Sequence, residues 1–192
     1  MAKMNAIEKF FVNSQLQYYL HKWFWLGRFL EKLPRMPSYR NILEIGSGVG
    51  VTAQYLAKKY PTARILATDF DENSTEIAKE KEYPANISFQ QADATKLPFP
   101  DNHFDAAFSV LTLHHINDFE GVIAELARTV KQNGDVYIMD IPSASFNFAY
   151  FRRSVIPGAF TKVDLVRLGE KYGLTMKDYG GKYLFALQGQ KL

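Results

Sequence analysis

The sequence contains no cysteine among its 192 residues. This absence excludes disulfide bonds, thiolate nucleophiles and zinc sites with cysteine ligands. No apolar run reaches the roughly 18 to 20 residues that cross a bilayer. Asn5, Glu8 and Lys9 interrupt the N-terminal stretch, so it does not have the pattern of a secretory signal. The sequence therefore predicts a cytoplasmic location.

A large excess of one charge is also lacking. Lys and Arg number 23, Asp and Glu number 20, and the formal net charge is +3. Nucleic-acid-binding proteins usually gather basic residues in a patch, whereas the densest groupings here are the pairs Lys58-Lys59 and Arg152-Arg153. We therefore expect no nucleic-acid partner. The spacing of histidines and carboxylates predicts no metal site, and nothing in the sequence indicates an oligomeric state.

From residue 41 onward, short β-rich runs alternate with helical runs. Such alternation is typical of a parallel sheet covered by helices. Near the C-terminus, Gly180-Gly181 separates two β-rich runs, which indicates a hairpin and hence an antiparallel pair at one edge. The expected strands are residues 41–45, 64–68, 87–91, 104–110, 136–141, 174–179 and 182–187. The expected helices are residues 51–60, 72–82, 119–130 and 162–172, the third of them stopped by Asn133-Gly134.

The N-terminal part differs from the rest. Apolar residues between positions 5 and 33 recur at helical spacing, and Pro34 and Pro37 separate them from the first strand. We therefore divide the chain into an N-terminal helical segment, residues 1–38, and one α/β domain, residues 39–192.

Two motifs suit a nucleotide. Residues 42–50 read Ile-Leu-Glu-Ile-Gly-Ser-Gly-Val-Gly, an apolar strand that enters a glycine turn. Glycines let a ligand approach the backbone, and the following helix start supplies free N–H groups. Asp69 closes the second strand 19 residues after Gly50, where a carboxylate accepts hydrogen bonds from ribose hydroxyls, and Phe70 offers a face to a purine. A strand–helix turn and a helix cap are the alternatives without a ligand.

Further motifs follow in order: Asp93-Ala94 after the third strand, then Leu97-Pro98-Phe99, then Phe104-Asp105 at the start of the fourth strand. Together with the glycine turn and the acidic strand end, this order resembles the class I S-adenosylmethionine-dependent methyltransferases. The small-molecule branch that includes the ubiquinone/menaquinone methyltransferases is the most similar. The resemblance covers residues 39–142. It implies a Rossmann-like, doubly wound seven-stranded α/β sheet and methyl transfer from S-adenosylmethionine to a small molecule.

The resemblance also implies roles for individual residues. Gly46, Ser47 and Gly48 would lie against the methionine part of the cofactor, with Glu44 orienting that loop or the amino group. Asp69 would bind the ribose and Phe70 would lie beside the adenine. Asp93 and the Ala94 N–H would bind the edge of the adenine ring. Three residues at the end of the fourth strand would close the site: Ser109, Val110 and Leu111.

Candidates for catalysis are few. Methyl transfer is a direct displacement, in which positioning contributes about 7 to 11 kcal/mol in favourable cases, and an alcohol or phenol acceptor also needs a base. His114 and His115 follow the fourth strand, so we expect them to touch the substrate, unless they bond locally at a helix start. Asp140, at the end of the fifth strand, is expected to be a structural cap. His21 and His103 look peripheral.

In the family that the sequence resembles, elements before the first strand and after the fifth form a lid. The segments concerned are the N-terminal helix and residues 143–160, with Tyr18, Tyr19, Trp23 and Tyr150 as substrate or lid residues. Aromatic faces suit a sulfonium, and they favour an apolar or aromatic acceptor. Core packing is the alternative. A membrane-surface helix is a further alternative that we do not favour.

Two other functions stay open from the sequence. A nicotinamide-dependent oxidoreductase would explain the glycine turn and Asp69. It leaves Asp93-Ala94 unexplained, and Gly50 comes one residue early for its glycine pattern. A non-catalytic module that binds S-adenosylmethionine would explain the lack of an evident base.

Overall fold

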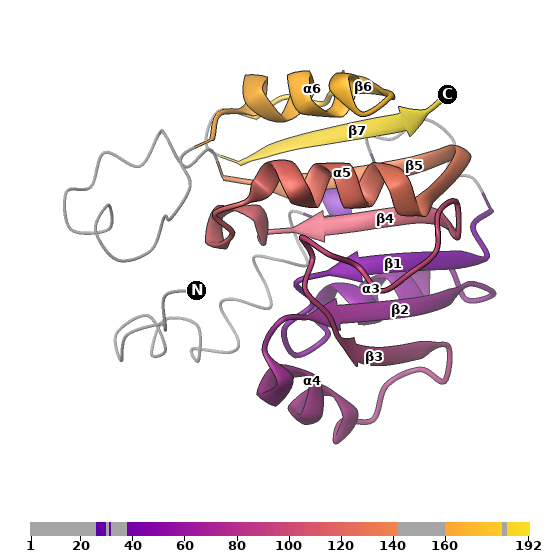
Figure 1. Ribbon diagram of the computed structural model, residues 1–192. Helices are drawn as coiled ribbons and strands as arrows, with labels where there is room; N and C mark the ends of the chain where they lie inside the picture. The colour runs from indigo at the N-terminus through magenta and orange to yellow at the C-terminus, as the bar shows by residue number, and fades with distance from the viewer. Residues whose placement is uncertain (1–25, 30, 32–37, 142–159, 182–183) are drawn as a thin grey trace.

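The computed structural model describes residues 26–29, 31, 38–141, 160–181 and 184–192. They form an open seven-stranded sheet in the order β3-β2-β1-β4-β5-β7-β6, with helices on both faces (Figure 1). The strands are β1 (Asn41–Ile45), β2 (Arg64–Asp69), β3 (Ile87–Gln91), β4 (Phe104–Val110), β5 (Val130–Asp140), β6 (Leu174–Asp178) and β7 (Phe185–Lys191). The helices are α3 (Val51–Lys59), α4 (Glu72–Lys79), the short 3₁₀ helix η1 (Leu113–His115), α5 (Phe119–Thr129) and α6 (Lys162–Lys171).

The direction of the strands confirms the predicted fold class. Strands β1 to β5 pair in parallel, and β7 runs antiparallel to both of its neighbours, β5 and β6. The arrows of β1, β2 and β4 therefore point one way in Figure 1 and that of β7 points the other way. The order of the strands reverses between β1 and β4. In open α/β sheets, ligands bind beyond the carboxyl ends of the strands at this reversal.

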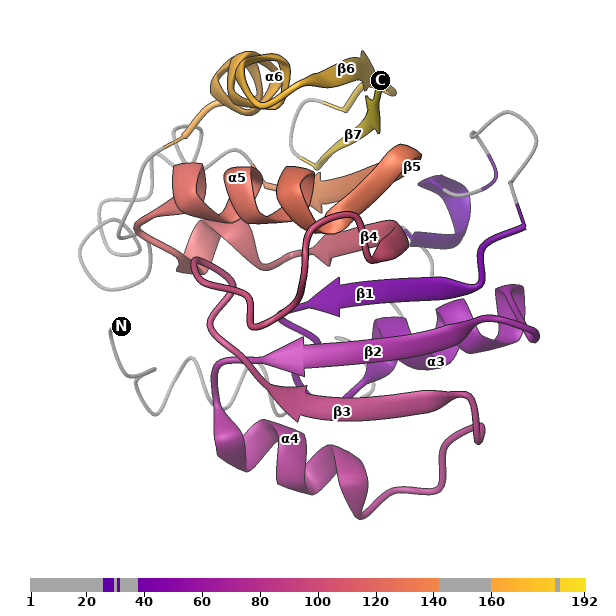
Figure 2. The same cartoon turned by 45° about the vertical axis from the view of Figure 1, so that its right-hand side comes forward.

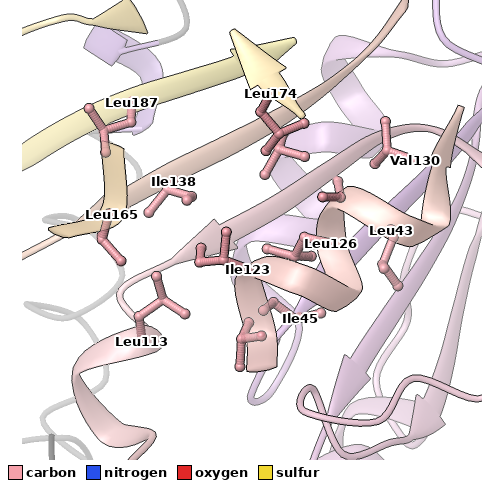
Figure 3. Close-up of a cluster of buried hydrophobic side chains, with 14 of the residues drawn as sticks. Leu43, Ile45, Leu113, Ile123, Leu126, Val130, Ile138, Leu165, Leu174 and Leu187 are labelled. Atoms are coloured by element: carbon pink, nitrogen blue, oxygen red, sulfur yellow. The ribbon is translucent and has the colours of Figure 1, made fainter. Parts of the chain in front are cut away.

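Both faces of the central strands β1 and β4 are buried, and their side chains alternate between two cores. Ile42 of β1 belongs to the core under α3, whereas Leu43 and Ile45 belong to the core under α5 and α6. Figure 2 shows α3 and α5 on opposite sides of the sheet, and Figure 3 shows the second core, with Ile123 and Leu126 of α5 above the strands. Strands buried on both faces are continuous apolar runs, which explains why β1 and β4 were readily predicted.

The start of β5 differs from the prediction. The strand begins at Val130, directly after α5, and not at residue 136. Phe104 pairs with Val130 and Ala106 pairs with Asp135, so residues 131–134 form a bulge. Asn133 has a φ of 62°, and a Cβ on Gly134 would lie 2.8 Å from a backbone oxygen of β4. Asn133-Gly134 is therefore a bulge in the strand, and its interpretation as the stop of the helix was wrong.

The C-terminal hairpin is present, but its second strand was misplaced. We expected residues 182–187, whereas β7 spans Phe185–Lys191. Its position is set by pairing with β5, in which Phe185 lies opposite Asp140. Gly180 and Gly181 do have the positive φ values of a turn, 86° and 105°. The turn motif was correctly recognised, but it did not determine the register.

A buried network of hydrogen bonds links strands β5 and β7 to the residues that precede β1. The Tyr39 hydroxyl donates to Asp135 at 2.6 Å and lies 2.6 Å from the Tyr137 hydroxyl. Gln188 of β7 donates to the other Asp135 oxygen at 2.8 Å. Burial raises the pKa of Tyr39 and of Tyr137 above the ordinary tyrosine value. This network connects β5, β7 and the entry to β1.

Most of the predicted N-terminal helix lies outside the described residues. Residues 26–29 and 31 are helical, and Leu26 and Phe29 are buried in the core under α3. The lid residues Tyr18, Tyr19, Trp23 and Tyr150, and residues 143–159, also lie outside the described ranges, so the lid and the division at residue 38 stay predictions. Of the helices that the structure describes, none is long and apolar enough to cross a bilayer.

Candidate functional site

The glycine turn follows β1 at the carboxyl edge of the sheet. Gly46, Gly48 and Gly50 all have left-handed φ values, 62°, 53° and 86°. Their surroundings differ, because a Cβ on Gly46 would lie 2.1 Å from Thr112 Cγ2, while a Cβ on Gly48 would have no atom within 4 Å. The turn is therefore packed against the end of β4 at Gly46 and open at Gly48.

Asp69 joins this turn to the end of β2. Its carboxylate accepts the Gly48 N–H at 2.7 Å and the Asp71 N–H at 2.9 Å. The Ser47 N–H donates to the Thr68 carbonyl at 2.9 Å. Phe70, the next residue, is 49% exposed. The sequence-predicted residues Gly46, Ser47, Gly48, Asp69 and Phe70 are thus brought together at one edge.

The end of β3 comes to the same place. The Ala92 N–H donates to the Asp69 carbonyl at 2.9 Å, which places Asp93 and Ala94 beside Asp69. Asp93 is exposed, and its Oδ1 accepts from the Thr95 N–H at 2.8 Å and from the Thr95 hydroxyl at 2.7 Å. The three loops predicted to share a site therefore lie side by side.

The Leu97-Pro98-Phe99 segment is clamped to α5. The Leu97 N–H donates to Glu125 at 2.7 Å. Arg128 donates to the carbonyls of Leu97 and Phe99 at 3.1 and 2.7 Å and pairs with Glu125 at 2.7 Å. The hydrogen bond from Arg128, opposed by partial burial, holds the pKa of Glu125 below its ordinary range. This motif fixes the loop that follows Asp93.

Tyr83, which lies in none of the sequence motifs, supports the glycine turn. The Tyr83 hydroxyl donates to the Val49 carbonyl, and its ring packs against Phe89 with centroids 5.4 Å apart. A Cβ on Gly50 would lie 2.6 Å from the Phe89 ring. Tyr83, between α4 and β3, and Phe89 of β3 thus hold the turn. No feature of the sequence indicated this contact across 34 positions.

The remaining predicted cofactor residues lie beneath the turn or at the end of β4. The side chains of Glu44, Ser109 and Val110 are buried, with 0%, 0% and 2% exposure. Leu111 has a left-handed φ of 55°, and its N–H donates to the Met139 carbonyl at 2.8 Å. The chain therefore turns sharply after β4 and enters η1.

The end of β5 organises this turn through Asp140. Its buried carboxylate accepts the N–H groups of Thr112 and Leu113 at 3.1 and 2.8 Å. It also lies 2.6 Å from Nδ1 of His114, whose side chain is 10% exposed. Asp140 is thus a cap, as expected, but no local pattern indicates its pairing with His114. His115 is exposed, and its ring centroid lies 3.9 Å from that of His114.

Thr112, which follows β4, contacts the glycine turn that follows β1 at the carboxyl edge of the sheet. Its hydroxyl donates to the Gly46 carbonyl at 3.3 Å, across the reversal between β1 and β4. The sequence did not single out Thr112, because the contact exists only once β1 and β4 pair. Within the described ranges, no group of three or more His, Cys, Asp or Glu residues has the arrangement of a metal site.

An open, doubly wound sheet with a glycine turn and an acidic strand end at its point of reversal defines the Rossmann-like nucleotide-binding class of α/β domains. Residues 43–138 match the model of the methyltransferase domain family. The match includes the glycine turn, Asp69, Asp93 and the end of β4. The chain therefore belongs to the methyltransferase domain family.

Individual relatives agree with this assignment. The chain is 32% identical over 114 residues to a ubiquinone/menaquinone biosynthesis C-methyltransferase of Desulfotalea psychrophila, covering 59% of this chain and 46% of that protein. It thus spans about half the length of the curated relatives that it matches.

Solved structures share the fold at low sequence identity. One is a SAM-dependent methyltransferase from Aquifex aeolicus, with a TM-score of 0.71, 21% identity, and coverage of 86% of this chain and 89% of that one. Another is phosphoethanolamine N-methyltransferase 2 of Haemonchus contortus in complex with S-adenosyl-L-methionine, with a TM-score of 0.66, 21% identity, and coverage of 79% and 37%.

Proposed function

We propose that this protein transfers a methyl group from S-adenosylmethionine to a small-molecule acceptor. The observation that carries the proposal is the convergence of three loops, in which the Asp69 carboxylate accepts the Gly48 N–H and the Asp69 carbonyl accepts the Ala92 N–H. Family membership supports methyl transfer over the oxidoreductase alternative. The relative from Desulfotalea psychrophila, a C-methyltransferase by name, supports a small-molecule acceptor.

The described residues fit an adenosine. The space above Gly48 is open, Asp69 holds a carboxylate beside it, and Phe70 offers an exposed ring. We assign the ribose to Asp69 and the adenine to Phe70, Asp93 and the Ala94 N–H.

The methionine end belongs to the glycine turn. We assign it to Gly46, Ser47 and Gly48, with Glu44 beneath the turn and Ser109 to Leu111 beside it. When bound, S-adenosylmethionine supplies a methyl group on a positively charged sulfur. The residues of the chain bind it and hold the acceptor in line, which is the main contribution that a protein makes to a displacement. His114 and His115 lie on the β4 side, where we place the acceptor.

A ligand-binding measurement tests the cofactor. S-adenosylhomocysteine at 100 times its dissociation constant stabilises a folded protein by about 2.7 kcal/mol, which for a chain of this size raises the melting temperature by about 5 to 10 °C. Asp69→Ala should remove most of this shift. Glu76→Ala, which alters an exposed ion pair on α4, is the matched control. The proposal fails if wild-type protein shows no shift with S-adenosylmethionine or S-adenosylhomocysteine, or a larger one with NADH.

A further inference from the structure

The contact between His114 and Asp140 determines which ring nitrogen faces the carboxylate. Nδ1 of His114 lies 2.6 Å from Oδ1 of Asp140. A carboxylate accepts hydrogen bonds and donates none, so Nδ1 carries the proton in this contact, and the lone pair of the neutral ring is on Nε2. No described residue makes a hydrogen bond to Nε2. Within the described part of the chain, Nε2 is therefore left with its lone pair unused.

Asp140 can cap the backbone at the end of β4 without a contact to a histidine. The Asp140 carboxylate already accepts three backbone N–H groups, from Thr112, Leu113 and Ile141, at 3.1, 2.8 and 2.7 Å. These contacts fix the carboxylate before His114 is counted. The same carboxylate also fixes the tautomer of the imidazole ring, as orienting carboxylates do for functional histidines.

His114 and Asp140 lie next to the proposed cofactor site. Thr112 contacts Gly46 at the reversal between β1 and β4, and η1, which contains His114, begins at the next residue. Asp69 and Gly48 lie on the β2 side of Gly46. His114 and Asp140 lie on the β4–β5 side. An acceptor that meets the cofactor at its methionine end therefore approaches beside η1.

We propose that His114 is the proton acceptor of the reaction, that Asp140 is its positioning residue, and that the acceptor is a hydroxyl compound methylated on oxygen. This inference rests on the proposed function. The hydroxyl proton moves to Nε2, the freed oxygen electron pair forms the bond to the methyl carbon, and the carbon–sulfur bond breaks with its electron pair left on sulfur. Asp140 stabilises the resulting imidazolium, which then releases the proton to water. His115 is exposed and has no such role.

Methyl transfer to a mixed panel tests this assignment. The panel contains phenols and alcohols, amines, and thiols, with methyl-labelled S-adenosylmethionine and analysis of the methylated atom. We expect transfer to the oxygen of a hydroxyl compound. For that compound His114→Ala should lower kcat by about 10² to 10⁴ with little change in KM, the usual contribution of a general base. Added imidazole should restore part of the rate.

His103→Gln is the matched control. His103 is an exposed histidine at the opposite end of β4, packed edge-on against Phe104, and we expect its replacement to leave the rate unchanged. Transfer only to nitrogen, sulfur or carbon, no transfer to any hydroxyl compound, or a rate of His114→Ala within fivefold of wild type would each overturn the inference.

Two further measurements separate this inference from folding defects and from the proposed function. Nuclear magnetic resonance of ¹⁵N-histidine-labelled protein should show the neutral His114 ring protonated on Nδ1, and Asp140→Asn should alter that pattern. A ring protonated on Nε2 would overturn the assignment even if the alanine variant does not fold. Calorimetry should show S-adenosylhomocysteine binding to wild type and His114→Ala alike. Loss of binding to the wild type would reject the proposed function itself.

Discussion

Replacement of Gly46 by alanine is expected to destabilise the protein more than replacement of Gly48. Both residues have left-handed backbones, with φ values of 62° and 53°, and an ordinary residue in that conformation costs about 1 to 2 kcal/mol. The two positions differ in their surroundings. A Cβ at Gly46 would lie 2.1 Å from Cγ2 and 2.3 Å from Oγ1 of Thr112, whereas a Cβ at Gly48 would meet nothing within 4 Å.

Thr112 has little freedom to move away. Its N–H is bonded to Asp140 at 3.1 Å, and its hydroxyl lies within 3.4 Å of the carbonyls of Ile45, Gly46 and Val110. Overpacking of this kind costs about a further 1 to 3 kcal/mol. We therefore expect a loss of about 1 to 2 kcal/mol for Gly48→Ala and about 2 to 5 kcal/mol for Gly46→Ala.

Urea unfolding followed by circular dichroism measures both variants against wild type. The difference between them should be about 1 to 3 kcal/mol, or roughly 2 to 12 °C in melting temperature. Binding should depend differently on the two positions, since the methyl group of Gly48→Ala would enter the space assigned to the cofactor and weaken S-adenosylhomocysteine binding at least tenfold. Stabilities equal within about 0.5 kcal/mol, the scatter of neutral surface changes, would refute the argument from the Thr112 contact.

Three further predictions concern residues that support the site. The hydrogen bond from Arg128 lowers the pKa of Glu125. The contribution of Glu125 to stability is therefore present above its unfolded-state pKa and is lost as the pH falls through its folded-state pKa. Glu125→Gln should lower the melting temperature at about pH 7 and have little effect at about pH 3. A melting difference that does not change with pH would contradict this assignment. Tyr39→Phe removes the hydroxyl bonded to Asp135 and should lower the free energy of unfolding by about 1 to 3 kcal/mol in urea titrations; no loss would mean that water replaces the hydroxyl. Tyr83→Phe removes the hydrogen bond to the glycine turn and should weaken S-adenosylhomocysteine binding roughly two- to tenfold by calorimetry, with unchanged affinity counting against a supporting role.

The parts of the fold that could be predicted are those in which one short segment carries its own signal. Strands β1, β3 and β4 begin and end at the predicted residues. The bulge at Asn133-Gly134 was missed because an Asn-Gly sequence with a left-handed Asn, as at Asn133, ends helices as readily as it interrupts strands. The position of β7 was missed because its partner, β5, lies more than 40 residues away in the sequence.

The candidate site likewise combines residues that local motifs indicate with contacts that only the folded sheet creates. Gly48 and Asp69 lie in motifs whose spacing indicates a nucleotide, and the structure joins them by a hydrogen bond. The contact of Thr112 with Gly46 spans 66 positions, and that of His114 with Asp140 spans 26. Neither has a local pattern, because each depends on which strands become neighbours in the sheet.

The place of β7 between β5 and β6 has a consequence during synthesis. Strands β1 to β5 emerge from the ribosome in full before residues 185–191, and until then the outer edge of β5 exposes unpaired peptide groups. Such an edge is a template for pairing with other chains. Deletion of residues 185–191 would make that exposure permanent and would also leave β6 without a neighbour, so aggregation rather than a smaller folded domain is the expected fate of the shortened chain.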